Sequence, residues 1–281
     1  MNVKHIEETI DGHGGLSLYT QRYELDNPKA AVVILHGYCE HSQRYGHVVE
    51  RLLDDGFNCY LLDHRGHGRS DGARAAVTRF EEYLQDLDLF MAFVKEHYPS
   101  GPMFLLGHSM GGLIAVNYML SRKPEVTGVV LSSPYLGLKA EVPVWKKKLG
   151  TIVSNFLPKI SLKSDLDPYL LSHDEAVVQE YIADPSVSKV VNTRWFTEST
   201  TSQQYCFDHA SEWKWTTLFM HGGDDRIADP QSTKDFYQKT DPKNTELQIL
   251  EGLYHEIFNE IDRKRVLDLT ATWLLDHMPE D

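Results

Sequence analysis

The residues most able to do chemistry lie in segment 105–112, Leu-Leu-Gly-His-Ser-Met-Gly-Gly, where a serine stands between glycines. This spelling is typical of a nucleophile elbow, a sharp turn from a strand into a helix that exposes the serine hydroxyl. Gly107 and Gly111 leave room beside the turn. The helix that follows would offer free amide groups and the positive end of its dipole to an oxyanion. The segment therefore predicts a nucleophile at Ser109.

The surroundings of Ser109 separate this interpretation from a chance match, because a serine between glycines also occurs in ordinary loops. Residues 103–106 form a short apolar run typical of a buried strand. Residues 113–120 suit a helix, with no helix breaker before Pro124. A strand, a turn and a helix thus follow one another, and this order favours the functional interpretation.

Ser109 alone is a weak nucleophile at neutral pH, so a base must take its proton and an acid must orient the base. In proteins built around a nucleophile elbow, the acid and then the histidine follow the serine, in loops after later strands. The apolar residues 217–220 run into a polar loop that contains Asp224 and Asp225, and both aspartates are candidates for the acid. His255 lies just past the last predicted strand and is the candidate base.

An oxyanion hole needs two amide donors, and the residue after the nucleophile supplies one of them. The second comes from the loop after the first parallel strand, which here is segment 36–42, His-Gly-Tyr-Cys-Glu-His-Ser. We therefore expect the backbone N–H groups of Tyr38 and Met110 to hold the oxyanion.

Two further histidines, His64 and His67, lie in segment 63–68, Asp-His-Arg-Gly-His-Gly, after the second parallel strand. Such a pair could suggest a metal site, but no further ligand cluster with zinc-like spacing follows. Hydrogen bonds that stabilise the turn explain both side chains equally well. We expect no metal here, and the chemistry outlined above requires no cofactor.

The elements that must position these residues alternate regularly. Apolar runs typical of buried parallel strands cover residues 31–35, 59–62, 103–106, 126–131, 217–220 and 245–250. Segments 48–53 and 80–94 between them have apolar residues at helical spacing. Segments 6–10 and 16–25 predict an antiparallel hairpin at the start, and segment 263–277 predicts a closing helix. The pattern predicts an α/β protein with a mostly parallel central sheet and helices on both faces.

The strand pattern stops between residues 134 and 216, and we interpret segment 134–216 as a mainly helical cap inserted between two core segments, 1–133 and 217–281. Within it, residues 144–157 have apolar side chains at helical spacing beside three consecutive lysines. Residues 139–163 hold six lysines and one glutamate. A mobile lid on an anionic lipid surface and a packed helix with solvated lysines both fit this pattern, and we favour the packed helix.

Composition limits the classes of partner and the cellular compartment that we expect for the protein. A net charge of −13 argues against nucleic acid, because phosphate binding needs a basic surface. Three scattered cysteines, Cys39, Cys59 and Cys206, fit a reducing compartment better than a disulfide framework. The first residues lack the apolar segment of a secretory signal, and no apolar run reaches membrane-spanning length. We expect a cytoplasmic protein of unspecified oligomeric state, with transient membrane or micelle contact through the cap left open.

Together these motifs resemble the monoacylglycerol lipase and lysophospholipase branch of the α/β-hydrolases, a group of serine aminopeptidase-like hydrolases. The resemblance covers nearly the whole core in the right order, through segments 36–45, 63–72, 107–112, 225–226 and 252–256. It implies the α/β-hydrolase fold and a catalytic triad of Ser109, Asp225 and His255. Asp224 is the fallback for the acid.

The oxyanion loop both matches the family and departs from it. Tyr38 and Met110 match the family's oxyanion donors. Cys39 stands where the family commonly has glycine. The departure implies a thiol near the mouth of the active site and partial inhibition by bulky thiol reagents.

The resemblance implies a serine hydrolase that cleaves esters of single-chain lipids through an acyl-enzyme, first of all monoacylglycerol to fatty acid and glycerol. Lysophospholipids come next, and small carboxylic esters and thioesters would use the same machinery. The cap holds apolar residues that suit an acyl channel and a packed helical cap equally well. These residues include Leu136, Leu138, Val144, Trp145, Leu149, Ile152, Phe156, Leu157 and Ile160.

Three alternatives were weighed against this function. An epoxide hydrolase or a dehalogenase on this fold would have an aspartate in the position of Ser109. The serine therefore argues against both activities. An aminopeptidase would need a site for a free amino group, for which acidic cap residues such as Glu198 or Asp208 are candidates. A non-catalytic ligand-binding protein on the same scaffold is disfavoured by the complete set of triad residues.

Overall fold

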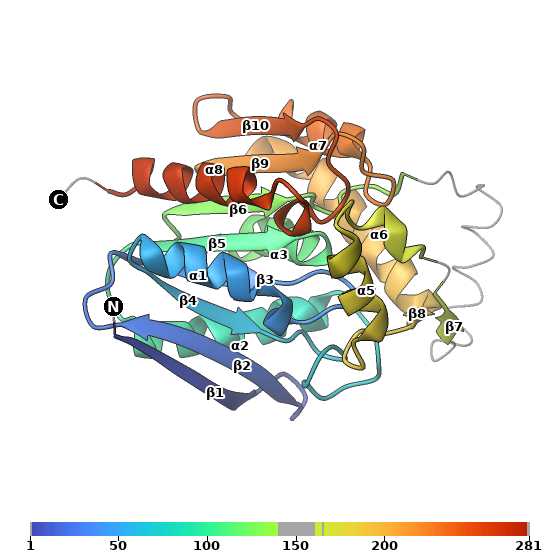
Figure 1. Ribbon diagram of the computed structural model, residues 1–281, viewed down its shortest axis with the longest axis horizontal. Helices are drawn as coiled ribbons and strands as arrows, with labels where there is room; N and C mark the ends of the chain where they lie inside the picture. The colour runs from blue at the N-terminus through green and yellow to red at the C-terminus, as the bar shows by residue number, and fades with distance from the viewer. Residues whose placement is uncertain (1, 140–160, 165, 280–281) are drawn as a thin grey trace.

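The computed structural model describes residues 2–139, 161–164 and 166–279, and in this part of the chain an eight-stranded sheet forms the centre of the protein (Figure 1). The strand order is β1-β2-β4-β3-β5-β6-β9-β10. The bounds of the strands are β1 Val3–Asp11, β2 Ser17–Leu25, β3 Ala30–Leu35, β4 Phe57–Leu62, β5 Met103–His108, β6 Gly128–Ser132, β9 Thr217–Gly222 and β10 Thr245–Leu250. β1 pairs antiparallel with β2 and β2 with β4, and the other neighbours are parallel. The predicted hairpin and mostly parallel sheet are confirmed.

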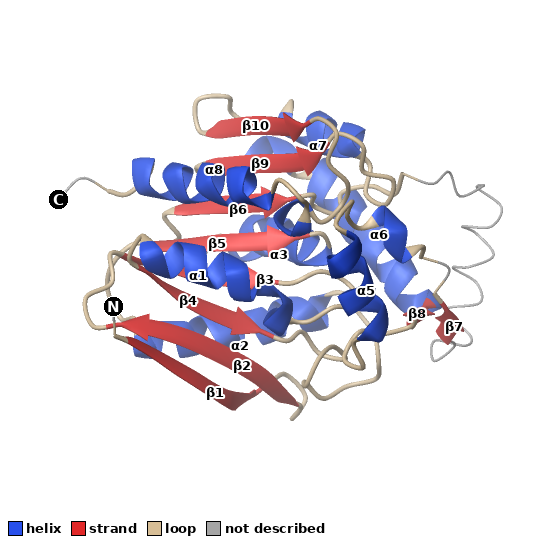
Figure 2. Cartoon of the chain, viewed as in Figure 1, coloured by secondary structure: helices blue, strands red, loops and turns tan. Residues whose placement is uncertain are grey.

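Helices cover both faces of the sheet, as the sequence pattern predicts (Figure 2). One face packs against α1 and α8, and the other against α2, α3 and α7. Their bounds are α1 Gly46–Asp54, α2 Glu81–His97, α3 Met110–Arg122, α7 Pro230–Tyr237 and α8 Arg263–Asp276. Successive residues of β3 alternate between the two cores, since Val32 belongs to one apolar cluster and Val33 to the other. Burial on both faces therefore explains the continuous apolar run of this strand.

Residues 161–164 and 166–192 lie beyond the carboxyl ends of the parallel strands, at the right of Figure 1, and residues 193–216 lead from there back to the start of β9. They form β7 Ser161–Lys163, α5 Glu175–Ala183, β8 Val190–Asn192 and α6 Thr193–Asp208, with short 3₁₀ turns at Pro168–Leu170 and Ala210–Glu212. β7 and β8 pair antiparallel. The sequence pattern misses both, because three residues are too few to show a strand period. The predicted basic helix at 144–157 lies outside the described residues.

None of the helices described for residues 2–139, 161–164 and 166–279 has the length and apolar character that crossing a membrane requires.

The turn between β5 and α3 holds Ser109 in a strained backbone conformation. Its φ of 49° and ψ of −114° are rare for a residue with a side chain. A Cβ added to Gly107 would lie 2.6 Å from the carbonyl oxygen of Gly111, and one added to Gly111 would lie 2.2 Å from that of Leu35. The start of α3 thus packs against the ends of β5 and β3 only because both positions lack side chains.

Replacing Gly111 with alanine should therefore lower the free energy of unfolding by about 1–3 kcal/mol, because the new methyl group meets backbone that cannot yield. Urea titration followed by circular dichroism measures this loss. Gly46→Ala is the matched control, since Gly46 also opens a helix and a Cβ there meets nothing within 4 Å. Equal stability of the two variants would contradict the tight contact between α3 and β3.

Candidate active site

Three loops at one edge of the sheet carry the predicted catalytic residues. Ser109 follows β5, Asp225 lies in the loop after β9, and His255 lies in the loop after β10. The carboxyl ends of parallel strands share one edge, which is where α/β proteins bind their ligands. Residues separated by more than one hundred positions in the sequence meet there for this reason.

The structure brings Ser109, His255 and Asp225 into one hydrogen-bonded series. The Nε2 atom of His255 lies 2.9 Å from Ser109 Oγ, and its Nδ1 atom lies 2.6 Å from Asp225 Oδ2. All three residues are buried, with exposed fractions of 7%, 4% and 2% for Ser109, His255 and Asp225. Asp224, the fallback acid, is exposed to solvent and takes no part in the series.

The carboxylate of Asp225 stays charged although it is buried. Its Oδ1 accepts hydrogen bonds from the amides of Ile227 and Ala228, at 2.8 and 3.1 Å. Burial alone would raise the pKa of Asp225, but the neighbouring histidines, above all His255, outweigh it and hold this pKa well below the ordinary value. Burial likewise opposes charge on His255, yet Asp225 outweighs it and raises the pKa of His255. The pair therefore suits His255 to receive a proton from Ser109.

The two predicted oxyanion donors face the same space as Ser109. Tyr38 and Met110 both line the pocket into which Ser109 opens. Met110 is the first residue of α3, where helix geometry leaves the amide without an intrahelical partner. Among the residues that the structure describes, neither amide N–H is engaged in a hydrogen bond. Both are therefore free to bind an oxygen beside Ser109.

The pocket beside Ser109 has a volume of about 350 Å³ and a mostly apolar wall. Its large side chains come mainly from residues 135–227 and include Tyr135, Leu166, Leu171, Tyr181, Trp195 and Ile227. The part of the predicted acyl channel that falls on residues 140–160 lies outside the described residues. Leu136 is buried in the core cluster. The described wall alone makes a site suited to an apolar chain next to Ser109.

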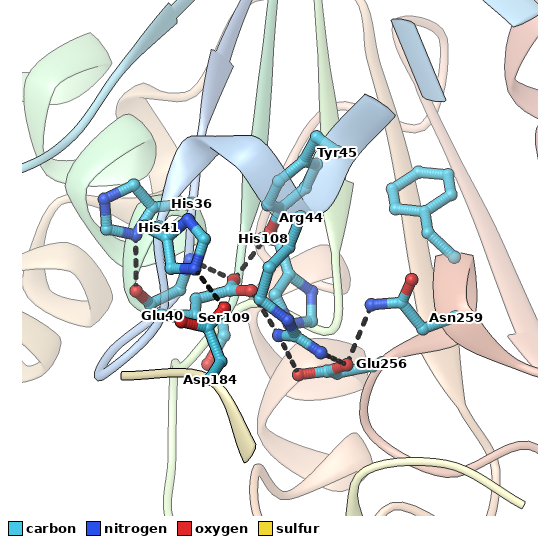
Figure 3. A network of polar contacts seen from close by, with 12 residues as sticks. His36, Glu40, His41, Arg44, Tyr45, His108, Ser109, Asp184, Glu256 and Asn259 are labelled. Carbon is cyan, nitrogen blue, oxygen red and sulfur yellow. Dashed lines mark hydrogen bonds and ion pairs between the residues drawn. The ribbon is translucent and has the colours of Figure 1, made fainter. Parts of the chain in front are cut away.

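Arg44 ties the oxyanion loop to the histidine loop (Figure 3). Its guanidinium donates two hydrogen bonds of 2.7 Å to the carboxylate of Glu256 and one of 2.6 Å to Glu40 Oε2. Glu40 Oε1 in turn accepts from the amide of Gly37 at 2.6 Å. Glu256 adjoins His255, so one cation fixes both loops. The sequence motifs include these charged residues without giving them a role, although Glu40 and Arg44 have the spacing of an i,i+4 ion pair.

The side chain of Tyr38 joins the oxyanion loop to the wall of the pocket. Its hydroxyl donates to the carbonyl of Ala75 at 2.6 Å and accepts from the amide of Asn192 at 3.2 Å. Its ring stacks on Trp195, with ring centroids 3.6 Å apart. The backbone amide of Tyr38 is therefore held in place by contacts of its own side chain.

Cys39 lines the pocket, and the residue is 3% exposed. The residue adopts a left-handed φ of 66°, which explains why glycine suits this position. Its side chain is buried, its Sγ lies 3.6 Å from the carbonyl oxygen of Val190, and burial raises its pKa to about 12. The thiolate is the reactive form, so we now expect thiol reagents to act slowly at neutral pH.

His64 and His67 pack behind the oxyanion loop against His36, with ring centroids 4.5 and 5.5 Å from that of His36. The Nδ1 atom of His67 bonds the carbonyl of Arg65 at 2.9 Å, which fits the predicted turn role. The His64 ring makes no hydrogen bond to any described residue, so the prediction is wrong for its side chain, and only its amide bonds the ring of His36. Within the described part of the chain, no three His, Cys, Asp or Glu side chains form a metal-binding group.

The parallel sheet, the strained serine turn and the residues gathered around it define an α/β-hydrolase. The family model described as serine aminopeptidase, S33, matches residues 26–262, and the chain belongs to this family of serine hydrolases. This assignment confirms the resemblance seen in the sequence motifs.

Named relatives and solved structures agree with this family. The chain is 31% identical to a monoacylglycerol lipase of Mycolicibacterium smegmatis, over 97% of this chain and 98% of the relative. It is also 31% identical to a phospholipase of Bacillus subtilis, over 87% of this chain and 94% of the relative. The crystal structure of Paleococcus ferrophilus monoacylglycerol lipase superposes with a TM-score of 0.84 at 30% identity, covering 92% of this chain and 99% of that one.

Replacing Tyr38 with phenylalanine should lower kcat/KM for ester hydrolysis by about three- to tenfold, the scale of one neutral hydrogen bond. The ring and its stacking on Trp195 remain, while the hydroxyl that joins Ala75 to Asn192 is lost. Steady-state kinetics measure the change. Tyr83→Phe is the control, because the buried Tyr83 hydroxyl bonds no described residue. A Tyr38→Phe enzyme as active as this control would show that the hydroxyl does not support the oxyanion loop.

Proposed function

We propose that the protein hydrolyses esters of single-chain lipids, with monoacylglycerol as the preferred substrate and fatty acid and glycerol as the products. The observation that carries this proposal is the series from Ser109 through His255 to Asp225, which opens directly into an apolar pocket. The relatives named as monoacylglycerol lipases support the substrate class.

In the proposed reaction, Ser109 Oγ attacks the ester carbonyl carbon while His255 takes the proton of the serine hydroxyl. The amides of Tyr38 and Met110 stabilise the negative oxygen of the tetrahedral intermediate. The C–O bond to the alcohol then breaks, and His255 gives its proton to the departing oxygen. Water activated by the same histidine attacks the acyl-enzyme and releases the fatty acid. Asp225 stabilises the charged form of His255 in both halves, and no cofactor takes part.

The apolar pocket wall supports a lipid acyl chain over a short acyl group. The ring of Trp195 and the side chains of Leu171 and Ile227 offer an acyl chain apolar surface beside Ser109. An acyl chain that fills this space would supply binding energy that lowers the barrier at the reacting carbonyl. An acetyl group is too short to do so. Lysophospholipid hydrolysis is the second candidate, favoured by the phospholipase of Bacillus subtilis among the relatives.

A serine aminopeptidase activity finds less support, because the pocket has no free carboxylate among its described residues for a substrate ammonium. Glu198 accepts a hydrogen bond from the amide of Phe80, and neither it nor Asp208 lines the pocket. The glutamates that do line it are both bound by Arg44.

Segment 134–216 serves as the cap in this proposal and contacts the micelle or membrane surface that supplies the lipid. Leu162 supports this role, because it lines the pocket while 55% of its surface is exposed. Tyr169, 52% exposed, adds a second large apolar side chain from the same segment. Exposed apolar side chains beside a pocket are suited to contact with lipid.

Ser109→Ala should lower turnover by at least about 10⁴-fold, because the remaining triad residues cannot replace the nucleophile. Ser121→Ala, farther along α3, is the matched control and should keep wild-type activity. The measurement is product release from acetyl, octanoyl and oleoyl monoacylglycerols, a lysophospholipid, a thioester and an aminoacyl anilide. We expect the longer monoacylglycerols to give the highest kcat/KM. Highest activity on the anilide or on the acetyl ester would refute the proposed substrate class.

A further inference from the structure

A second histidine, besides His255, contacts the acid of the proposed triad. His221 lies on β9, is fully buried, and places its Nε2 atom 3.0 Å from Asp225 Oδ2. This is the oxygen that His255 approaches at 2.6 Å. The Nδ1 atom of His221 lies 2.8 Å from the hydroxyl of Thr233 on α7, which is also fully buried. The series therefore continues past Asp225 to His221 and Thr233.

With both imidazoles neutral, the hydrogen-bonding rules of each group give this series one direction. An ionised carboxylate only accepts hydrogen bonds, so the His221 nitrogen facing Asp225 carries a proton. In the neutral imidazole the other nitrogen is an acceptor, and the Thr233 hydroxyl donates to it. On the other side, His255 donates from Nδ1 to Asp225 and accepts from Ser109 at Nε2. The two imidazoles thus hold opposite tautomers on one carboxylate oxygen.

The position of the Asp225 carboxylate is fixed by four donors. The amides of Ile227 and Ala228 bind Oδ1, and the two imidazoles bind Oδ2. The amides determine where one oxygen lies, and His221 limits rotation of the other. A donor at Oδ2 also withdraws part of the negative charge that His255 experiences.

We propose that His221, held in one tautomer by Thr233, is a positioning residue that orients the Asp225 carboxylate and limits its pull on His255. This role rests on the proposed function, in which His255 is the base. Neither His221 nor Thr233 lines the pocket, so substrate binding does not depend on them directly.

The other groups that act on His255 remain in place when His221 changes. The ring of His108 lies 5.0 Å from that of His255, and Glu40 and Glu256 both favour its charged form. Both glutamates are held by Arg44, which substitution of His221 leaves unchanged. A change in the titration of His255 after substitution of His221 therefore reports on Asp225.

The test compares His221→Leu, His221→Gln and Thr233→Val with the wild-type enzyme, in kcat and KM and in the pH profile of kcat/KM on a soluble nitrophenyl ester. His221→Leu removes the donor, so the Asp225 carboxylate stabilises the protonated form of His255 more strongly. The acid limb of kcat/KM, which reports the base of the free enzyme, should then move up by about one pH unit. We expect kcat to fall by about ten- to a hundredfold with an unchanged KM.

The two milder variants separate positioning from simple packing. His221→Gln keeps an N–H donor near the position of Nε2, so its acid limb should return to the wild-type pH. Thr233→Val should move the limb in the same direction as His221→Leu but by less, and it decides the question if His221→Leu fails to fold. An acid limb that stays at the wild-type pH in the folded variants lacking the donor or its support would overturn the role of His221. A wild-type enzyme without ester hydrolysis would instead refute the proposed function, and the role of His221 would fall with it.

Discussion

The whole arrangement depends on one backbone constraint, the left-handed conformation of Ser109 between a strand and a helix. Such a conformation is unfavourable for a residue with a side chain, and it persists only because the surrounding structure over-determines it. The Ser109 amide bonds the carbonyl of Ser132 on the neighbouring strand, and its carbonyl accepts from Leu113 and Tyr135. The close approach of Gly111 to Leu35 then sets α3 against β3. The Ser109 hydroxyl and the Met110 amide consequently share one rigid turn, which fixes their separation before any substrate arrives.

The stabilisation of buried charged groups is the second constraint. Hydrogen bonds and ion pairs with other residues provide it in place of solvent. The Asp225 carboxylate receives two amides and two imidazoles, and Arg44 is enclosed by two glutamates. Breaking such a set by removing one member leaves an uncompensated charge in the interior. Each set also joins loops that follow different strands. The contacts that compensate the buried charges therefore also fix the geometry of the site. This link explains why the loops around Ser109 can be irregular and still hold reacting groups at hydrogen-bonding distances.

The sequence predicts what depends on local pattern and misses what depends on pairing across the fold. Six parallel strands are predicted to within two residues at each end. In five of them burial on both faces produces a largely continuous apolar run, whereas β10 alternates more buried and more exposed residues. Ser109, Asp225 and His255 stand out because each follows one of these strands, so the strand itself marks the loop. The bond from His221 to Thr233, the Tyr38 hydroxyl between Ala75 and Asn192, and the reach of Arg44 to Glu256 have no such mark. They join strands, helices and loops whose approach only the folded backbone determines.

The most direct measurement of the central claim, that His255 activates Ser109 as a nucleophile, is covalent labelling by a fluorophosphonate followed by peptide mapping. Wild-type protein should carry one adduct, on the peptide that contains Ser109. Replacing His255 with alanine should slow labelling by about 10³-fold or more, because the hydroxyl then loses the base that takes its proton. Labelling of the His255→Ala protein at the wild-type rate, or an adduct on another residue, would contradict this account.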